Sequence, residues 1–154
     1  SPALRLAYRD EQFGVPKNVY IIGMMNTADR SLAMIDYALR RRFSFYTMRP
    51  AFESEQFKKQ AESINSDLYI KAIETVKQLN KVISEDKSLG KGFEIGHSYF
   101  CSEKPEDITD DYVKSIIEYE IIPTLEEYWF DNESKLNEQK AAFEKLLGDV
   151  NGTV

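Results

Sequence analysis

The sequence predicts an α/β part followed by an α-helical subdomain. An apolar run at residues 19–25 is typical of a strand buried on both faces of a parallel sheet. A second strand candidate follows at residues 43–48, with a helical pattern between the two. Beyond it, apolar residues recur at helical spacing and strand patterns stop. We therefore expect an α/β part over residues 1–49, a helical subdomain over residues 50–148 and a flexible tail over residues 149–154.

Composition narrows the class of protein. The 154 residues are 42% hydrophobic and 30% charged, which suits a chain that buries one core. A formal net charge of -6 argues against a general polyanion-binding surface. One cysteine and one histidine provide no disulfide and no metal-ligand set, so we expect a cytoplasmic protein without a metal site. The longest apolar run is far shorter than the roughly 20 residues that cross a bilayer, so no membrane partner is expected.

The predicted α/β part contains one β-α-β unit. Its helix should extend over residues 31–41, with apolar residues on one face and Asp29 or Ser31 as the N-terminal cap. Two strands and one helix do not form a stable α/β sheet by themselves. The missing strands must then come from residues absent from this sequence, so we expect a piece of a longer protein.

The predicted subdomain contains four helical patterns, of which the second has the clearest apolar stripe. Their expected bounds are residues 52–64, 68–84, 110–129 and 132–147. Pro123 should kink the third helix or begin a new one, because proline lacks a backbone donor. The fourth helix should end at Gly148. Between the second and third patterns, three glycines indicate a loop: Gly90, Gly92 and Gly96.

Asn26 lies at the end of the first predicted strand, which is where α/β sheets bind ligands. Its amide could hold a water molecule or a phosphate oxygen at that position. Alternatively, Asn26, Thr27 and Asp29 only form a turn and cap the following helix. The position at the strand end leaves both interpretations open.

Arg40, Arg41 and Arg42 lie at the end of the predicted helix. Basic residues at a helix C-terminus gain on the order of 0.5 kcal/mol from the helix dipole and need no ligand. Three in succession, however, point around much of the helix and repel one another unless anions neutralise some of them. We therefore expect an external phosphate or a facing acidic surface as their partner.

A family resemblance begins with MNTADRS at residues 25–31 and DYALRRRF at residues 36–43, and continues through VPKNVYIIG, GKGFEIGHSYF and EIIPTLEEYWFD. Over essentially the whole chain, the sequence resembles the McrB family, the AAA+ GTPase subunits of modification-dependent, 5-methylcytosine-specific restriction systems. The resemblance implies a C-terminal fragment with part of a P-loop AAA+ core, followed by a helical AAA+ lid. That core part would hold the sensor-1 strand, the arginine-finger helix and the last strand. The phosphate loop and the Walker B acid would be missing.

The resemblance also implies roles for individual residues. Asn26 would be the sensor-1 residue, which orients the attacking water and contacts the γ-phosphate. Arg41 or Arg42 would act in catalysis as the arginine finger on the nucleotide of a neighbouring subunit, and the sequence does not decide between the arginines. Other residues would lie near the nucleotide or the subunit interface: Asp29, Arg30, Arg40 and, from the lid, His97 and Ser98. For His97, the favoured alternative is a histidine satisfied by a backbone carbonyl.

Cofactors and partners follow from the same resemblance. The complete protein would bind GTP or ATP with Mg²⁺ and form a ring of identical subunits. Its other partners would be a McrC-like nuclease subunit and DNA, the latter bound through a missing N-terminal domain, and hydrolysis would drive DNA translocation. This chain alone should be inactive and should not bind nucleotide tightly. A MoxR-type AAA+ chaperone ATPase and a non-catalytic helical interaction module are the alternatives from other classes.

Overall fold

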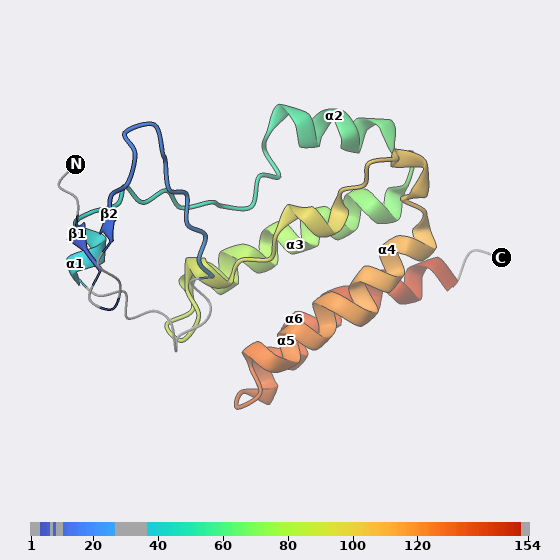
Figure 1. Ribbon diagram of the computed structural model, residues 1–154. Coiled ribbons are helices and arrows are strands. Elements are labelled where there is room, and N and C mark those ends of the chain that lie inside the picture. The colour runs from blue at the N-terminus through green and yellow to red at the C-terminus, as the bar shows by residue number, and fades with distance from the viewer. Residues whose placement is uncertain (1–3, 7, 9–10, 27–36, 152–154) are drawn as a thin grey trace.

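The computed structural model describes residues 4–6, 8, 11–26 and 37–151 (Figure 1). In its first part, two short strands, β1 (Leu4–Arg5) and β2 (Gln12–Phe13), pair antiparallel with Leu4 opposite Phe13. One short helix, α1 (Tyr37–Arg40), follows. The rest of the described chain before residue 50 forms no other helix or strand.

From residue 55 onward the described chain is mostly helical. The first helices are α2 (Glu55–Ser63) and α3 (Asp67–Glu85), followed by the 3-10 helices η1 (Lys91–Phe93), η2 (His97–Phe100) and η3 (Pro105–Asp107). A continuous rod then consists of α4 (Asp110–Ile116), the π-helix η4 (Ile117–Ile121) and α5 (Ile122–Tyr128). Helix α6 (Glu133–Asn151) is the last element and lies along this rod in Figure 1.

The hydrophobic core lies in this helical body. Helix α3 packs against α4, η1 and α6, and α5 packs against α6. The largest fully buried side chains come from several elements and include Tyr69, Phe100, Trp129 and Phe143. Among the described residues, every buried side chain lies at or after Phe52. The helical body therefore has a core of its own, whereas the domain boundary at residue 50 stays a prediction.

Serine and threonine caps explain where three of these helices begin. The side-chain oxygens of Ser54, Ser66 and Thr109 accept hydrogen bonds from backbone N–H groups three residues later, at 3.3, 3.0 and 3.2 Å. Each cap satisfies one of the N–H groups that a first helical turn leaves unpaired. The four predicted helices are confirmed at α2, α3, the α4–η4–α5 rod and α6, within a few residues at each end.

Two predictions about helix breaks had different outcomes. Pro123 lies in the first turn of α5, directly after η4, so the helix type changes at the predicted proline, although the chain stays helical through it. The prediction that the last helix ends at Gly148 is wrong, because α6 continues to Asn151. Among the described residues, the only positive φ belongs to Gly90, at 84°, so Gly148 does not adopt the left-handed conformation of a helix-ending glycine.

The structure does not confirm the predicted β-α-β unit. Residues 19–25 and 43–48 form no strand, and their side chains are exposed, with Ile22 at 91% and Met24 at 97%. A strand that is buried on both faces needs neighbouring strands and covering layers, and no described segment supplies them. Of the helix predicted over residues 31–41, the described part is helical from Tyr37 to Arg40, and residues 31–36 lie outside the described range.

Candidate functional site

The loop between α3 and α4 contains two of the predicted site residues, and Asn80 of α3 fixes it. The Asn80 Nδ2 donates to the carbonyl oxygen of Ile95 at 2.9 Å, and the Ile95 N–H donates to Asn80 Oδ1 at 2.6 Å. Both side chains are buried, so a single amide satisfies the two backbone groups of a buried residue. Sequence reasoning missed Asn80. The available signal was a polar residue on the apolar stripe of α3, between Val76 and Ile83.

Two tyrosine hydroxyls hold the short helices of the same loop. The Tyr69 hydroxyl donates to the carbonyl oxygen of Phe100 at 2.9 Å, and the Tyr128 hydroxyl donates to that of Phe93 at 3.0 Å. Burial raises the pKa of Tyr69 to about 12 and also raises the pKa of Tyr128. Both hydroxyls therefore stay protonated donors, and η1 and η2 are tied to α3 and α5.

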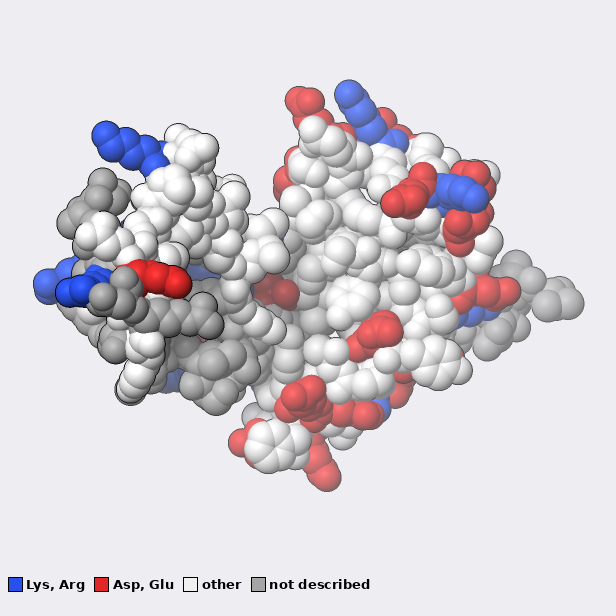
Figure 2. All heavy atoms as spheres, viewed as in Figure 1, with Lys and Arg blue, Asp and Glu red and all other residues white. Residues whose placement is uncertain are grey.

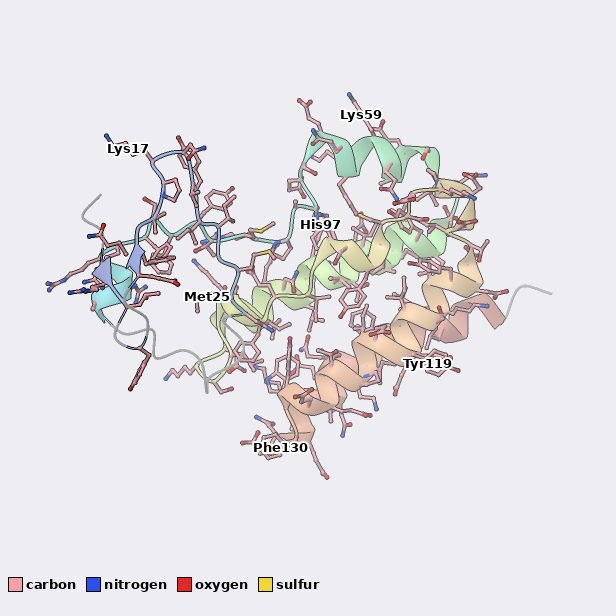
Figure 3. All side chains as sticks on the ribbon, viewed as in Figure 1. Lys17, Met25, Lys59, His97, Tyr119 and Phe130 are labelled. Atoms are coloured by element: carbon pink, nitrogen blue, oxygen red, sulfur yellow. The ribbon has the colours of Figure 1, made fainter. Side chains whose placement is uncertain are left out.

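His97 begins η2, and its ring lies against the segment that leads into α2 (Figure 3). The Ala51 N–H donates to His97 Nδ1 at 3.1 Å. The centroids of the Phe52 and Phe57 rings lie 6.0 and 5.8 Å from that of His97, both in edge-on geometry. Because Nδ1 accepts a hydrogen bond, a neutral His97 has its proton on Nε2. Its partner is thus a backbone N–H group rather than the predicted carbonyl.

Ser98 is exposed and lines a surface pocket of about 420 Å³ between η2 and the α4–η4 rod. The lining residues are Ser98, Tyr99, Tyr112, Ser115, Ile116, Tyr119 and Glu120. This lining offers hydroxyl groups, aromatic rings and one carboxylate, but it includes no lysine or arginine. Such a surface suits neutral polar groups or cations better than a phosphate, whose usual partners are basic side chains and backbone N–H groups.

The predicted residues before residue 50 lie apart from this loop. Asn26 is exposed and does not follow a strand. Arg40 ends α1, with its guanidinium carbon 5.7 Å from the centroid of the Phe45 ring, and Arg41 and Arg42 occupy the turn that follows. Figure 1 shows α1 well separated from the helical body, so the structure does not bring Arg41 and Arg42 together with His97 and Ser98. Two other predicted residues, Asp29 and Arg30, lie outside the described range.

A charged cluster, also missed by sequence reasoning, joins the ends of α3, α5 and α6. The Asp86 Oδ2 accepts hydrogen bonds from Lys135 Nζ at 2.5 Å and from Trp129 Nε1 at 3.0 Å, and Oδ1 accepts one from the Ser88 N–H at 2.7 Å. The Lys135 ammonium also lies 5.1 Å from the centroid of the Trp129 ring. The bonds from Lys135, Ser88 and Trp129 hold the pKa of Asp86 well below its usual range. No spacing in the sequence indicates this cluster, because its members come from helix ends far apart in the chain.

Two comparisons with known proteins bear on the helical body and on the part before it. A family model described as the McrB alpha-helical lid domain matches residues 71–137. The Type IV methyl-directed restriction enzyme EcoKMcrB subunit of Escherichia coli (strain K12) is 46% identical over an alignment 149 residues long, and this alignment covers 91% of this chain. This chain belongs to the McrB family. It spans 31% of the length of that McrB relative.

The McrB lid match places the helical body in a known domain class. Residues 71–137 include most of α3, the loop with His97 and Ser98, and the α4–η4–α5 rod. Within the part of this McrB-family chain that the structure describes, no group of three or more His, Cys, Asp or Glu residues is placed to hold a metal ion. None of its described helices combines the length and apolarity needed to cross a membrane.

Proposed function

We propose that this McrB-family chain supplies the lid and two partial nucleotide sites of a nucleoside triphosphatase in a methyl-directed restriction complex. The observation that supports it best is the extent of the identity. The 46% identical stretch covers 91% of the chain, well beyond the lid residues 71–137, and so includes the segment with Asn26 and the three arginines. The name of that relative describes methyl-directed restriction, and we propose the same process for the complete protein here.

In this proposal, Asn26 and the arginines serve different nucleotides. Asn26 is the sensor-1 residue of its own subunit, whereas Arg41 or Arg42 is the finger for the next one. Asp29, Arg30 and Arg40 lie beside the subunit interface. The exposure of Asn26, Arg41 and Arg42 supports these roles, because groups that act on a nucleotide held by other residues must be accessible.

The lid contribution comes from the loop that contains His97 and Ser98. Because the pocket beside Ser98 is lined by hydroxyls, tyrosines and Glu120, a contact there would suit the sugar or the base of the nucleotide. His97 does not line this pocket, and its Nδ1 is occupied by the Ala51 N–H.

The cofactor is GTP or ATP with Mg²⁺, held largely by residues outside this chain. The sequence has no phosphate-binding loop, and the described carboxylates form no metal site, so the residues of this chain do not fit Mg²⁺ by themselves. We therefore expect this chain alone neither to hydrolyse GTP nor to bind it tightly. Micromolar binding by the purified chain in calorimetry would contradict this expectation.

The proposed partners are identical subunits in a ring, a McrC-like nuclease subunit, and DNA bound by a part of the complete protein that lies outside this sequence. Charge distribution supports contact between copies of the chain. From residue 51 onward there are 22 acidic and 12 basic residues, whereas the first 50 residues have 8 basic and 4 acidic ones. Figure 2 shows acidic side chains spread over the helical body. An acidic face on one copy can therefore attract the arginine-rich part of another.

The deciding experiment uses the complete protein with Arg41→Ala, Arg42→Ala and Asn26→Ala made singly. Loss of the finger should lower nucleotide hydrolysis by about 10³-fold and leave nucleotide affinity little changed, because the finger acts on the bound transition state. Lys59→Ala, on the exposed surface of α2, is the control and should hydrolyse normally. Mixing inactive Arg42→Ala and Asn26→Ala subunits should restore part of the activity. At some interfaces, the intact Asn26 of an Arg42→Ala subunit then meets the intact Arg42 of an Asn26→Ala subunit.

Other outcomes distinguish the alternatives. If mixing restores nothing and Arg42→Ala loses nucleotide affinity, Arg42 belongs to the pocket of its own subunit. A complete wild-type protein that hydrolyses ATP and remodels proteins, without a nuclease partner, would favour the MoxR-type chaperone. A complete protein with no nucleotide-dependent oligomer and no hydrolysis would favour the non-catalytic helical module.

A further inference from the structure

The segment that contains His97 is held by hydrogen bonds on both sides of the histidine. Two residues before it, the buried Ile95 makes two hydrogen bonds to Asn80. Three residues after it, the carbonyl of Phe100 accepts a hydrogen bond from the buried hydroxyl of Tyr69. Because Asn80 and Tyr69 both belong to α3, the central helix of the core fixes both ends of the segment that holds the imidazole ring.

The ring of His97 contacts the point where the chain enters the helical body. The hydrogen bond from Ala51 to Nδ1 joins residues 46 positions apart in the sequence. Phe52 is 6% exposed and is the first buried residue of the described chain, whereas the described residues from Arg40 to Arg49 are all exposed. The contact therefore lies at the junction between the arginine-bearing part and the lid.

Apolar burial and a hydrogen bond fix this junction in different ways. The packing of Phe52 and Phe57 against the ring holds the segment close, but hydrophobic contact has little directionality. A hydrogen bond to a backbone N–H requires a defined donor direction and so orients the peptide that precedes Phe52. Only eight residues separate Arg42 from Ala51, so the direction of this peptide affects where the arginines lie.

We propose that His97 is a positioning residue: its Nδ1 fixes the direction in which the chain leaves the lid toward the arginine-bearing part. It acts through Ala51 and does not contact the nucleotide. The expected effect of His97 on hydrolysis rests on the proposed function, whereas its expected effect on the Ala51 amide does not. The proposed function and the positioning role of His97 can therefore fail separately.

A pair of substitutions separates the hydrogen bond from the packing. His97→Phe keeps an aromatic ring beside Phe52 and Phe57 but removes the acceptor, whereas His97→Asn places an amide oxygen near the position of Nδ1. Ser98→Ala, at the next residue, is the matched control. In this chain, amide hydrogen exchange followed by NMR should show faster exchange at Ala51 in His97→Phe by about fivefold or more, as for loss of one net hydrogen bond.

His97→Asn and Ser98→Ala should retain the protection of the Ala51 amide, and the amides of α3 should exchange equally in all four proteins. Equal exchange at α3 shows that each variant is folded, so a change at Ala51 is local. If Ala51 exchanges equally fast in the wild type and in His97→Phe, the proposal is wrong.

In the complete protein, His97→Phe should lower kcat by roughly ten- to a hundredfold with little change in nucleotide affinity, and His97→Asn should restore it. Weaker nucleotide binding in both His97 variants would make His97 a nucleotide contact and overturn the proposal. If the wild-type protein hydrolyses no nucleotide, the proposed function fails while the result at Ala51 still decides the role of His97.

Discussion

Asn80 is the buried polar side chain on which the order of the functional loop depends. Its two hydrogen bonds to Ile95 satisfy a backbone donor and a backbone acceptor that water does not reach. Leaving such groups unpaired costs more than the hydrogen bonds contribute when formed, because the groups stay desolvated. Asn80 thus stabilises the loop that contains His97 mainly because it avoids the free-energy cost of leaving the Ile95 N–H and carbonyl buried and unpaired.

Replacing Asn80 by leucine should therefore destabilise the chain strongly. The variant leaves two buried backbone groups unpaired, each at a cost of about 1 to 3 kcal/mol, so we expect a loss of about 2 to 5 kcal/mol in unfolding free energy. Urea denaturation followed by circular dichroism measures this loss. Asn137→Leu, on the exposed surface of α6, is the control and should stay within about 0.5 kcal/mol. Similar losses in both variants would refute the special role of Asn80.

The site residues show what the sequence can and cannot predict at this scale. The local pattern predicts a helix that ends at Arg41, and in the structure α1 ends one residue earlier, at Arg40. The partner of His97 cannot be predicted from local pattern, because the Ala51 N–H lies 46 residues away in the sequence. Only the packing of η2 against the segment that leads into α2 brings His97 and Ala51 together. Asn80 could have been recognised as a polar residue on an apolar helical stripe, although its partner Ile95 could not.

At the scale of elements, the helices were predictable and the strands were not. An amphipathic helix satisfies its backbone hydrogen bonds internally, so the pattern of residues 68–84 suffices to predict α3. A strand needs a neighbour for every backbone hydrogen bond, and residues 19–25 have no such neighbour within the described chain. Because residues 19–25 have no neighbouring strand in the described chain, their apolar side chains are exposed.

The junction of α3, α5 and α6 gives a prediction for the effect of pH. The low pKa of Asp86 means that folding favours its ionised form, which Lys135 and Trp129 stabilise. Its contribution is full above the unfolded-state pKa of about 3.9 and declines as the pH falls toward the lower folded-state pKa. Asp86→Asn should lower the unfolding free energy by about 2 kcal/mol at pH 7, the usual loss for hydrogen bonds to a charged group.

The difference between Asp86→Asn and the wild type should shrink as urea midpoints are measured from pH 7 down to pH 3. The wild type should also lose stability in acid through Glu53, whose pKa Lys58 and Lys77 lower to about 2, so the variant keeps some pH dependence. Asp131→Asn, an exposed carboxylate beside the same junction, is the charge control. A difference that stays constant from pH 7 to pH 3 would show that Asp86 does not act through its charge.

At the scale of the whole molecule, the chain combines a helical body that has its own core with a first part whose described residues form none. The body matches the McrB lid domain, and its described side chains supply all the burial. The first part instead exposes two apolar segments, residues 19–25 and residues 43–48, of which the second directly follows the arginines in the sequence. We propose that these two segments become strands of a sheet that other parts of a longer McrB-family protein complete.

Removing the first part should therefore leave the helical body intact. A variant that starts at Pro50 keeps Ala51 and the whole buried core, and a unit with its own core can fold alone. We expect its unfolding free energy in urea to lie within about 1 kcal/mol of that of the full chain, because exposed residues contribute little to stability. A variant that starts at Lys58 also lacks Phe52 and Phe57 and should lose about 3 kcal/mol or more, the usual cost of removing buried aromatic side chains. If the variant that starts at Pro50 is as unstable as the one that starts at Lys58, the first part contributes to the core, and the lid of this McrB-family chain does not fold by itself.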